Sequence, residues 1–316
     1  MSKKNIPIFF ACDDAYVPPL TVCLKSISEN SSDEYVYDVK ILTSSMSHES
    51  IKVLTGLEFK NVRVAVVNVD ERTSLIRGEL GKRLRDYYSE SIYYRIFIPS
   101  LFSHLDRAIY IDCDTVLVDD IAKMYFEELD GAILGAVADE SIPPVPEFCE
   151  YTRNWVGVES GRYFNSGVLL MDLSAFRRER LEERILDALC AYNFETVAPD
   201  QDYLNFFCRD RVKYLGAGWN KQPRKSDIDL GDIHLIHYNM FEKPWRYRDV
   251  LYGEIFWRYA EGTPYYDPLR LTLDGYTEFD RGLDCSKAKS LVINAASLSQ
   301  KDGGFAATLG TEVCNV

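Results

Sequence analysis

Two aspartates at the end of an apolar segment could hold a divalent cation. Residues 108–111 read Ala-Ile-Tyr-Ile, and Asp112, Cys113 and Asp114 follow them directly. Because side chains alternate along a strand, both carboxylates should leave its end on the same side. Two carboxylates held this close repel each other and are stabilised by a shared proton or by a cation. A hard cation there keeps coordination positions for phosphate oxygens, so the pair predicts a metal site for a phosphorylated ligand.

An acid-x-acid triplet is a weak signal when it is taken alone. The chain has 49 acidic residues among 316, so roughly seven or eight such triplets arise by chance. Two others stand at residues 200–202 and 227–229. Their ordinary role is that of a solvated strand end or a helix N-cap. The triplet at 112–114 is favoured because a mostly apolar segment, residues 115–118, follows it as well.

The whole chain alternates between strand-like and helix-like segments. Segments typical of strands lie at residues 6–12, 38–43, 62–69, 108–111, 132–138, 167–171, 212–215 and 233–238. Helical patterns lie at 20–27, 48–57, 92–97, 174–192 (with Ser174 as its cap) and 200–207. This alternation predicts an α/β protein with βαβ units and a mostly parallel sheet. Ligands of such sheets bind outside the carboxyl ends of the strands, where the aspartate pair should lie.

Charge and composition limit the classes of protein that fit. The net charge of −13 argues against a nucleic-acid binder, which would need a basic face. The eight cysteines lack C-x-x-C spacing and suit a reducing compartment. Residues 6–12 are too short a segment for a signal peptide or a membrane span, so we expect a cytoplasmic protein with at most peripheral membrane association. From about Gly282 onward, we expect a weakly ordered tail.

A glycine-rich dinucleotide loop does not follow the first predicted strand. Residues 13–16, Asp-Asp-Ala-Tyr, stand where G-x-G-x-x-G would be. A dinucleotide-binding dehydrogenase is therefore disfavoured. If a nucleotide binds, residues other than a glycine-rich loop must hold its phosphates.

Several motifs, taken in order, resemble glycosyltransferase family 8 over about residues 6–246. They are Ala-Cys-Asp-Asp at 11–14, Tyr-Tyr-Arg at 93–95, Asp-Cys-Asp at 112–114, Phe-Asn-Ser-Gly at 164–167, Asp-Gln-Asp at 200–202, and His237 followed by Lys243. The resemblance implies the Rossmann-like GT-A fold, a mostly parallel central sheet with helices on both faces. It places that domain at residues 1–265 and a small helical C-terminal extension, with a weakly ordered end, at 266–316.

The resemblance also implies an activity. Family members transfer a hexose, usually from UDP-glucose or UDP-galactose, and retain the anomeric configuration. The acceptor implied here is a saccharide or a surface glycan, as in lipopolysaccharide biosynthesis. Two other functions stay open: a catalytically silent UDP-sugar-binding protein, and a sugar-1-phosphate nucleotidyltransferase. The second would normally need a basic, glycine-rich loop near the first strand, where this chain has Asp13 and Asp14.

The resemblance assigns residues to the nucleotide-sugar by their position in the family motifs. By resemblance, Ala11, Asp13 and Tyr16 would hold the uracil and the ribose, and Tyr16 could stack on a ring. Cys113 lies within the metal motif and belongs to the same nucleotide-binding set. Arg95 would reach the donor sugar. The ordinary alternatives are a helix N-cap for the aspartate and a surface salt bridge for the arginine.

The metal ligands that the resemblance implies are Asp112, Asp114 and His237. Imidazole is a softer donor than carboxylate, so Mn²⁺ is expected, with Mg²⁺ as the second possibility. His234 precedes His237 by an odd spacing and should face the other way on a strand. Lys243 would neutralise the diphosphate as UDP leaves.

The donor-sugar residues implied by the family are Asn165, Asp200 and Gln201. Asp200 would accept hydrogen bonds from sugar hydroxyls, and Gln201 would lie beneath the anomeric carbon. An amide is a poor nucleophile, so a front-face reaction is favoured over a stable covalent intermediate. Two positions depart from the family pattern. Ala15 replaces a frequent Asn, and Met240 replaces a Gly, so the loop at Met240 is expected to run differently.

Overall fold

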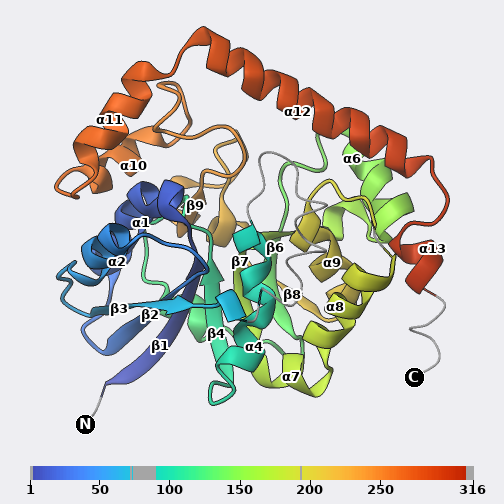
Figure 1. The fold of residues 1–316 in the computed structure, drawn as a ribbon, viewed down its shortest axis with the longest axis horizontal. Helices are drawn as coiled ribbons and strands as arrows, with labels where there is room; N and C mark the ends of the chain where they lie inside the picture. The colour runs from blue at the N-terminus through green and yellow to red at the C-terminus, as the bar shows by residue number, and fades with distance from the viewer. Residues whose placement is uncertain (1–2, 72, 74–89, 193, 311–316) are drawn as a thin grey trace.

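The chain folds around a seven-stranded sheet (Figure 1). The computed structural model describes residues 3–71, 73, 90–192 and 194–310. Across the sheet the strand order is β3-β2-β1-β4-β7-β6-β8. In that order the strands are Val62–Asn68, Tyr35–Thr43, Lys4–Ala11, Arg107–Ile111, Phe164–Asp172, Leu134–Ala138 and Val212–Tyr214. The predicted α/β class and mostly parallel sheet are confirmed.

Strand direction brings several segments of the chain to one edge of the sheet. β3, β2, β1 and β4 are parallel, and β6 is parallel to β8, whereas β7 is antiparallel to both β4 and β6. The carboxyl ends of β1, β4 and β6 therefore lie beside the beginning of β7. At this edge the backbone N–H of Asp112 donates to the carbonyl of Gly167 at 2.8 Å.

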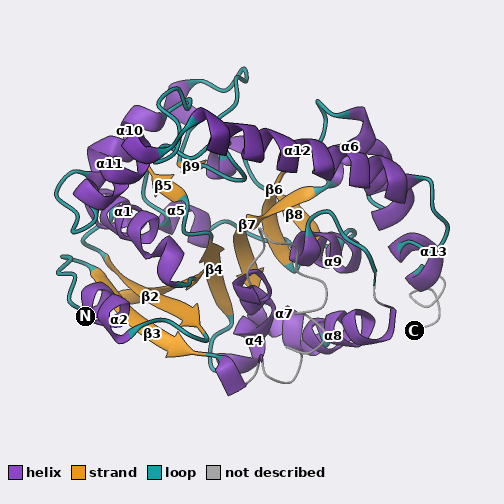
Figure 2. Ribbon diagram, turned by 45° about the horizontal axis from the view of Figure 1, so that its top comes forward, coloured by secondary structure: helices purple, strands orange, loops and turns teal. Residues whose placement is uncertain are grey.

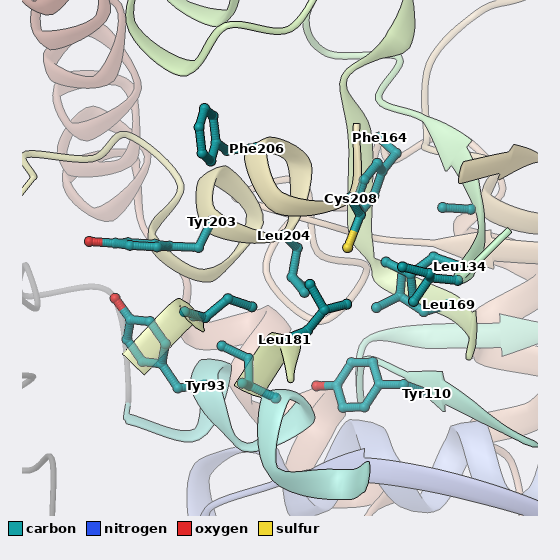
Figure 3. Close-up of a cluster of buried hydrophobic side chains, with 14 of the residues drawn as sticks. Tyr93, Tyr110, Leu134, Phe164, Leu169, Leu181, Tyr203, Leu204, Phe206 and Cys208 are labelled. Atoms are coloured by element: carbon teal, nitrogen blue, oxygen red, sulfur yellow. The ribbon is translucent and has the colours of Figure 1, made fainter. Parts of the chain in front are cut away.

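Helices cover both faces of the sheet (Figure 2). On one face lie α1 (Val17–Asn30), α2 (His48–Thr55) and α5 (Ala122–Tyr125). On the other lie the 3-10 helix η2 (Glu90–Phe97), α4 (Ile98–Leu101), α7 (Leu173–Arg178), α8 (Leu181–Tyr192) and α9 (Pro199–Cys208). In β1, Ile8 and Phe10 pack in the hydrophobic core between the sheet and α1, and Phe9 packs in the core on the opposite face, beneath α9. This alternation is the pattern of a strand buried on both faces. Figure 3 shows the core on the α9 face of the sheet, where side chains of α9, β4 and β7 pack together.

A second sheet of two strands carries the last predicted strand. β9 (Leu235–His237) pairs antiparallel with β5 (Thr115–Leu117), and His237 lies opposite Thr115. The strand predicted at 233–238 is therefore shorter and does not extend the main sheet. Because β5 begins directly after Asp114, this pairing places His237 beside the aspartate pair.

The helix predicted over residues 174–192 is broken in two. α7 is capped by the side chain of Asp172, which accepts from the N–H of Ala175 at 2.8 Å, and not by Ser174. Arg180 then adopts a φ of 51° in the left-handed region, and α8 begins after it. The apolar repeat of Leu181, Ile185 and Leu189 lies entirely within α8, so it does not reveal where that helix begins.

The C-terminal residues form helices. They are α10 (Gly253–Ala260), α11 (Tyr266–Gly275), α12 (Glu278–Ser299) and α13 (Phe305–Leu309). α12 passes over the domain and packs on α6 (Pro146–Tyr151) (Figure 1). It buries Leu291, Ala295 and Leu298, a stripe on one helix face that is inconspicuous because a small residue forms part of it. The predicted weakly ordered tail from about Gly282 is wrong as far as residue 310, and residues 311–316 lie outside the described residues.

The predicted division of the chain at residue 265 crosses a continuous set of helices. α10 lies before it and α11 after it, and both pack on α1. The two domain ranges, 1–265 and 266–316, therefore stay a prediction. None of the helices in the described part of the chain is both long and apolar enough to cross a bilayer.

Asp284 ties α12 to the segment that follows Lys243. Its carboxylate accepts from the hydroxyl of Tyr247 at 2.7 Å and from that of Tyr276, and it lies 3.8 Å from a guanidinium nitrogen of Arg246. Asp284 is buried. Removing such an acceptor leaves the donors without a partner, and an unsatisfied buried polar group costs more free energy than a typical hydrogen bond contributes.

We therefore expect Asp284→Ala to lower the free energy of unfolding by about 2 kcal/mol, measured by urea denaturation. Asp274→Ala is the matched control, because Asp274 pairs with Arg248 on the surface, where an ion pair contributes at most about 1 kcal/mol. Equal losses for the two variants would contradict a specific role of Asp284.

Candidate active site

Two aspartates and a histidine converge at the carboxyl edge of the sheet. Asp112 and Asp114 follow β4, and His237 ends β9. One possible ligand atom of each lies within 4.8 Å of the other two. The Nε2 of His237 is 3.2 Å from Asp114 Oδ1 and 3.7 Å from Asp112 Oδ2. His234 turns away to Asp119, at 2.9 Å, as its odd spacing predicted.

Each aspartate of the pair has its own cationic partner. Lys243 donates to Asp114 Oδ2 and, at 2.6 Å, to the carbonyl of Tyr238. Arg95 donates to Asp112 Oδ1 at 3.1 Å. Burial opposes the ionisation of Asp114, but the charge of Lys243 and the contact with His237 outweigh it, so the pKa of Asp114 lies below its ordinary value. Asp114 thus stays ionised, with Oδ1 directed toward His237 and Oδ2 toward Lys243.

Arg95 is a buried cation that links the aspartate pair to α9. Its side chain is 4% exposed, and its Nε lies 3.2 Å from Asp200 Oδ2. The guanidinium also lies 4.2 Å from the ring centre of Tyr110, whose hydroxyl donates to Asp112 at 2.8 Å. This burial excludes the surface salt bridge that is the ordinary alternative for an arginine.

Asp200 and Gln201 lie in the first turn of α9 and contact the beginning of β7. The N–H of Ser166 donates to Gln201 Oε1 at 2.9 Å, and its hydroxyl donates to Asp200 Oδ2 at 2.9 Å. Burial raises the pKa of Asp200; Arg95 opposes this rise and Asp112 adds to it. The structure thus brings Asp200 and Gln201, two of the three predicted donor-sugar residues, next to the metal motif.

A buried carboxylate that the sequence motifs do not include organises the amide side chains. Asp139 follows β6 and accepts from Gln222 at 2.8 Å, Gln201 at 3.0 Å and Asn165 at 3.1 Å. Burial opposes its ionisation, but these donors and Ser141 outweigh that effect, so the pKa of Asp139 is lowered. A signal for it exists in the sequence, because a carboxylate directly after a buried strand is the feature that selected the metal pair.

Gly167 allows the metal ligands to approach β7. A Cβ atom at this position would lie 2.4 Å from Asp112 Oδ2 and 2.4 Å from His237 Cε1. Both distances are far below van der Waals contact. Only glycine therefore permits this arrangement of the aspartate and the histidine.

The residues assigned to the nucleotide line the same edge. The thiol of Cys113 donates to the carbonyl of Ala11, the last residue of β1, at 3.2 Å. The ring centre of Tyr16 lies 5.9 Å from Lys243 Nζ. These residues are therefore close to the aspartate pair, and their predicted contacts with uracil and ribose stay a prediction.

Asp13 and the two departures from the family pattern lie in loops beside the site. Asp13 accepts from the N–H of Ala15 at 3.1 Å and caps the short helix η1 (Asp14–Tyr16), which is the ordinary role of an aspartate at such a place. Met240 adopts a φ of 55°, in the left-handed region that favours glycine. Met240 holds this angle at a cost of roughly 1 kcal/mol, and the expectation that its loop runs differently from that of the family stays a prediction.

The chain is similar to known glycosyltransferases. The model of glycosyl transferase family 8 matches residues 7–249. A putative glycosyltransferase of Haemophilus influenzae is 27% identical over 72% of this chain and 66% of its own length. The lipopolysaccharide 1,2-glucosyltransferase of Escherichia coli K12 is 30% identical over 57% of this chain and 56% of its own length. The chain thus spans less than two thirds of these two relatives.

A solved structure confirms the predicted GT-A fold. The crystal structure of the galactosyltransferase LgtC with donor and acceptor sugar analogues matches with a TM-score of 0.63. The two chains are 24% identical, and the match covers 82% of this chain and 96% of LgtC. At this identity the likeness is one of fold.

Asp202, the third residue of the acidic triplet in α9, carries a pH-dependent part of the stability. The hydroxyls of Tyr163 and Tyr151 donate to it at 2.6 and 2.7 Å. Burial nevertheless raises the pKa of Asp202 to about 7. The folded protein therefore holds this proton more tightly than the unfolded chain, whose aspartates titrate near 3.9. The resulting stabilisation is full below pH 3.9 and is lost as the pH rises through about 7.

We expect the free energy of unfolding of the wild type to fall, relative to that of Asp202→Asn, by roughly 1 kcal/mol per pH unit between pH 5 and 7. Urea denaturation at several pH values measures this difference. The control is Asp210→Asn, since Asp210 is exposed just beyond α9 and its variant should follow the wild type. Parallel profiles for the wild type and Asp202→Asn would contradict the raised pKa.

Proposed function

Since a family model matches residues 7–249, the chain belongs to glycosyl transferase family 8, and we propose that it is a retaining hexosyltransferase. It would move glucose or galactose from a UDP-sugar to a saccharide acceptor with the help of a divalent cation. The observation that carries this proposal is the cluster of Asp112, Asp114 and His237 beside Lys243.

The three side chains of this cluster fit a divalent cation. Two carboxylates and an imidazole supply oxygen and nitrogen donors and leave coordination positions for phosphate oxygens. The imidazole favours Mn²⁺, and Mg²⁺ is the second candidate. When bound, such an ion would polarise and neutralise the diphosphate of the donor.

Lys243 would stabilise the departing diphosphate from the protein side. Burial works against its charged form, but Asp114 outweighs this, and the pKa of Lys243 is raised. The ammonium therefore keeps its charge where negative charge develops. The nucleotide would lie along the end of β1, with its uracil and ribose against Ala11, Asp13 and Tyr16.

The donor sugar would lie between β7 and α9. Asp200 and Asn165 would bind its hydroxyls, and Gln201 would face the anomeric carbon. Arg95 would reach the sugar from its place between Asp112 and Asp200. Gln201 Oε1 accepts from the N–H of Ser166 at 2.9 Å. The hydroxyl of Ser166 lies 3.4 Å from the same oxygen but gives its single hydrogen to Asp200 at 2.9 Å, so a second lone pair of Gln201 remains for the developing positive charge.

We favour a front-face reaction because an amide is a poor nucleophile. The acceptor hydroxyl oxygen would bond to the anomeric carbon on the side from which UDP leaves. The bond between that carbon and the β-phosphate oxygen would break, and the hydroxyl proton would pass to the departing diphosphate. A trapped glycosyl adduct on Gln201 would contradict this mechanism.

The acceptor is proposed to be a saccharide of a surface glycan. The support is the relative named lipopolysaccharide 1,2-glucosyltransferase, which matches over part of both chains. We propose a cytoplasmic location with at most peripheral membrane association, in keeping with the donor. A silent UDP-sugar-binding protein is the second candidate function, and hydrolysis of the donor distinguishes it from an enzyme.

A panel of UDP-sugars tests the proposed donor and metal. We expect UDP-glucose or UDP-galactose to raise the melting temperature with Mn²⁺ and not without it. At 100 times its Kd a ligand stabilises the native state by about 2.7 kcal/mol. We also expect slow hydrolysis of the same sugar in the absence of acceptor. Binding without hydrolysis would indicate the silent protein, and no shift with any UDP-sugar would contradict the proposal.

A small substitution at Gly167 tests the metal site. We expect Gly167→Ala to weaken Mn²⁺ binding about tenfold or more, because its Cβ would displace Asp112 and His237. Titration calorimetry with Mn²⁺ measures the change. Gly161→Ala is the matched control, since a Cβ at Gly161 meets nothing within 4 Å. Wild-type affinity in Gly167→Ala would argue against these ligands.

A further inference from the structure

We propose that Asn220 fixes the tautomer of His237, keeping the hydrogen on Nδ1 and leaving Nε2 free to bind a cation. Asn220 Oδ1 lies 2.9 Å from His237 Nδ1, and Asn220 is 1% exposed. The inference rests on the proposed metal-binding role of His237. It makes Asn220 a positioning residue, because Asn220 acts on the ion only through the imidazole ring.

The hydrogen-bond directions are set by two groups whose roles are fixed by their chemistry. The backbone N–H of Gly167 can only donate, and it donates to Asn165 Oδ1 at 3.0 Å. The ionised carboxylate of Asp139 can only accept, and it accepts from Asn165 Nδ2 at 3.1 Å. Each end of the Asn165 amide is thus assigned by a different neighbour, and the two assignments agree.

The orientation of Asn165 determines that of Asn220. Because Asn165 Oδ1 accepts from Gly167, the atom of Asn220 that lies 3.0 Å from it is the amide nitrogen. The oxygen of Asn220 then faces His237 Nδ1, which must carry a hydrogen to donate to it. A hydrogen on Nε2 alone would place two lone pairs against each other at Asn220, in buried surroundings where water cannot replace the lost hydrogen bond. A hydrogen on Nδ1 alone directs the Nε2 lone pair toward Asp114 Oδ1, 3.2 Å away, so it suits a ring whose Nε2 holds a cation shared with the aspartates.

The backbone holds Asn220 against the histidine. Asn220 ends the 3-10 helix η5 (Ala217–Asn220), and the next residue, Lys221, accepts from the N–H of His237 at 2.8 Å. On the far side of the ring, Nε2 lies 3.2 Å from Asp114 Oδ1. One ring nitrogen is therefore bound to an outer hydrogen-bond partner and the other points at the aspartates, as a histidine ligand requires.

The tautomer can be read by ¹⁵N NMR from the protein loaded with Mg²⁺, which is diamagnetic. The chain has four histidines, so selective ¹⁵N-histidine labelling gives a spectrum that His237→Gln assigns. Long-range ¹⁵N–¹H correlations show which ring nitrogen carries the hydrogen. We expect Nδ1 of His237 to keep it. A hydrogen on Nε2 in the wild type would overturn the proposal.

Two variants of Asn220 test its role. Asn220→Leu removes the acceptor, and we expect the preference for the Nδ1 hydrogen to be lost and Mn²⁺ affinity to fall about 10- to 100-fold. Asn220→Asp keeps an oxygen for the ring, and we expect it to retain the tautomer. Asn61→Leu is the matched control, because Asn61 is a buried asparagine bonded to Ser32 and Asp33 instead.

These measurements separate this inference from the proposed transfer reaction. An unchanged tautomer and Mn²⁺ affinity in Asn220→Leu would overturn the role of Asn220. If that variant does not fold, loss of the Nδ1 hydrogen in Asn220→Asp overturns it, and its retention there supports it. Neither the NMR experiment nor the Mn²⁺ titration needs a donor sugar, so a protein that fails to use UDP-sugars could still show the predicted tautomer.

Discussion

Two carboxylates that stand one residue apart repel each other, and the neighbouring structure compensates this repulsion. Arg95 pairs with Asp112, Lys243 pairs with Asp114, and His237 lies within reach of both carboxylates. Without these groups, repulsion and burial would favour protonation of one aspartate. Each partner comes from a different element: η2, the loop after β9, and β9 itself. The main sheet supplies the pair, and the small second sheet brings the histidine to it.

The proposed donor-sugar side of the site is more rigidly built than the proposed nucleotide side. Asn165 and Gln201 each use both ends of their amides in hydrogen bonds between buried groups, and both donate to Asp139. Such groups need little reorganisation when charge develops on a bound sugar, which is the main source of electrostatic catalysis. Asp13 and Tyr16, in contrast, are partly exposed and belong to a short helix and its cap. We infer that the nucleotide side adapts more to its ligand than the sugar side does.

Much of the fold could be predicted because its central strands are buried on both faces. Apolar segments such as 108–111 and 167–171 are conspicuous in the sequence, and aspartates directly after 108–111 must lie where a buried strand reaches the edge of the sheet. The later parts were harder to predict. The pattern of α12 is weak because Ala295 forms part of its narrow buried stripe. Asn220 and the closeness of Gly167 to the ligands depend on how β7 and β9 are placed in space, which local periodicity does not encode.

The central claim is that one ion is held by the two aspartates and the histidine, with the donor diphosphate completing its shell. Pulsed electron paramagnetic resonance of bound Mn²⁺ tests it most directly, since it detects the nuclei around the ion. The account predicts coupling to one imidazole ¹⁴N that disappears in His237→Gln, and coupling to ³¹P once UDP is added. A Mn²⁺ signal with neither coupling in the wild type in the presence of UDP would contradict it.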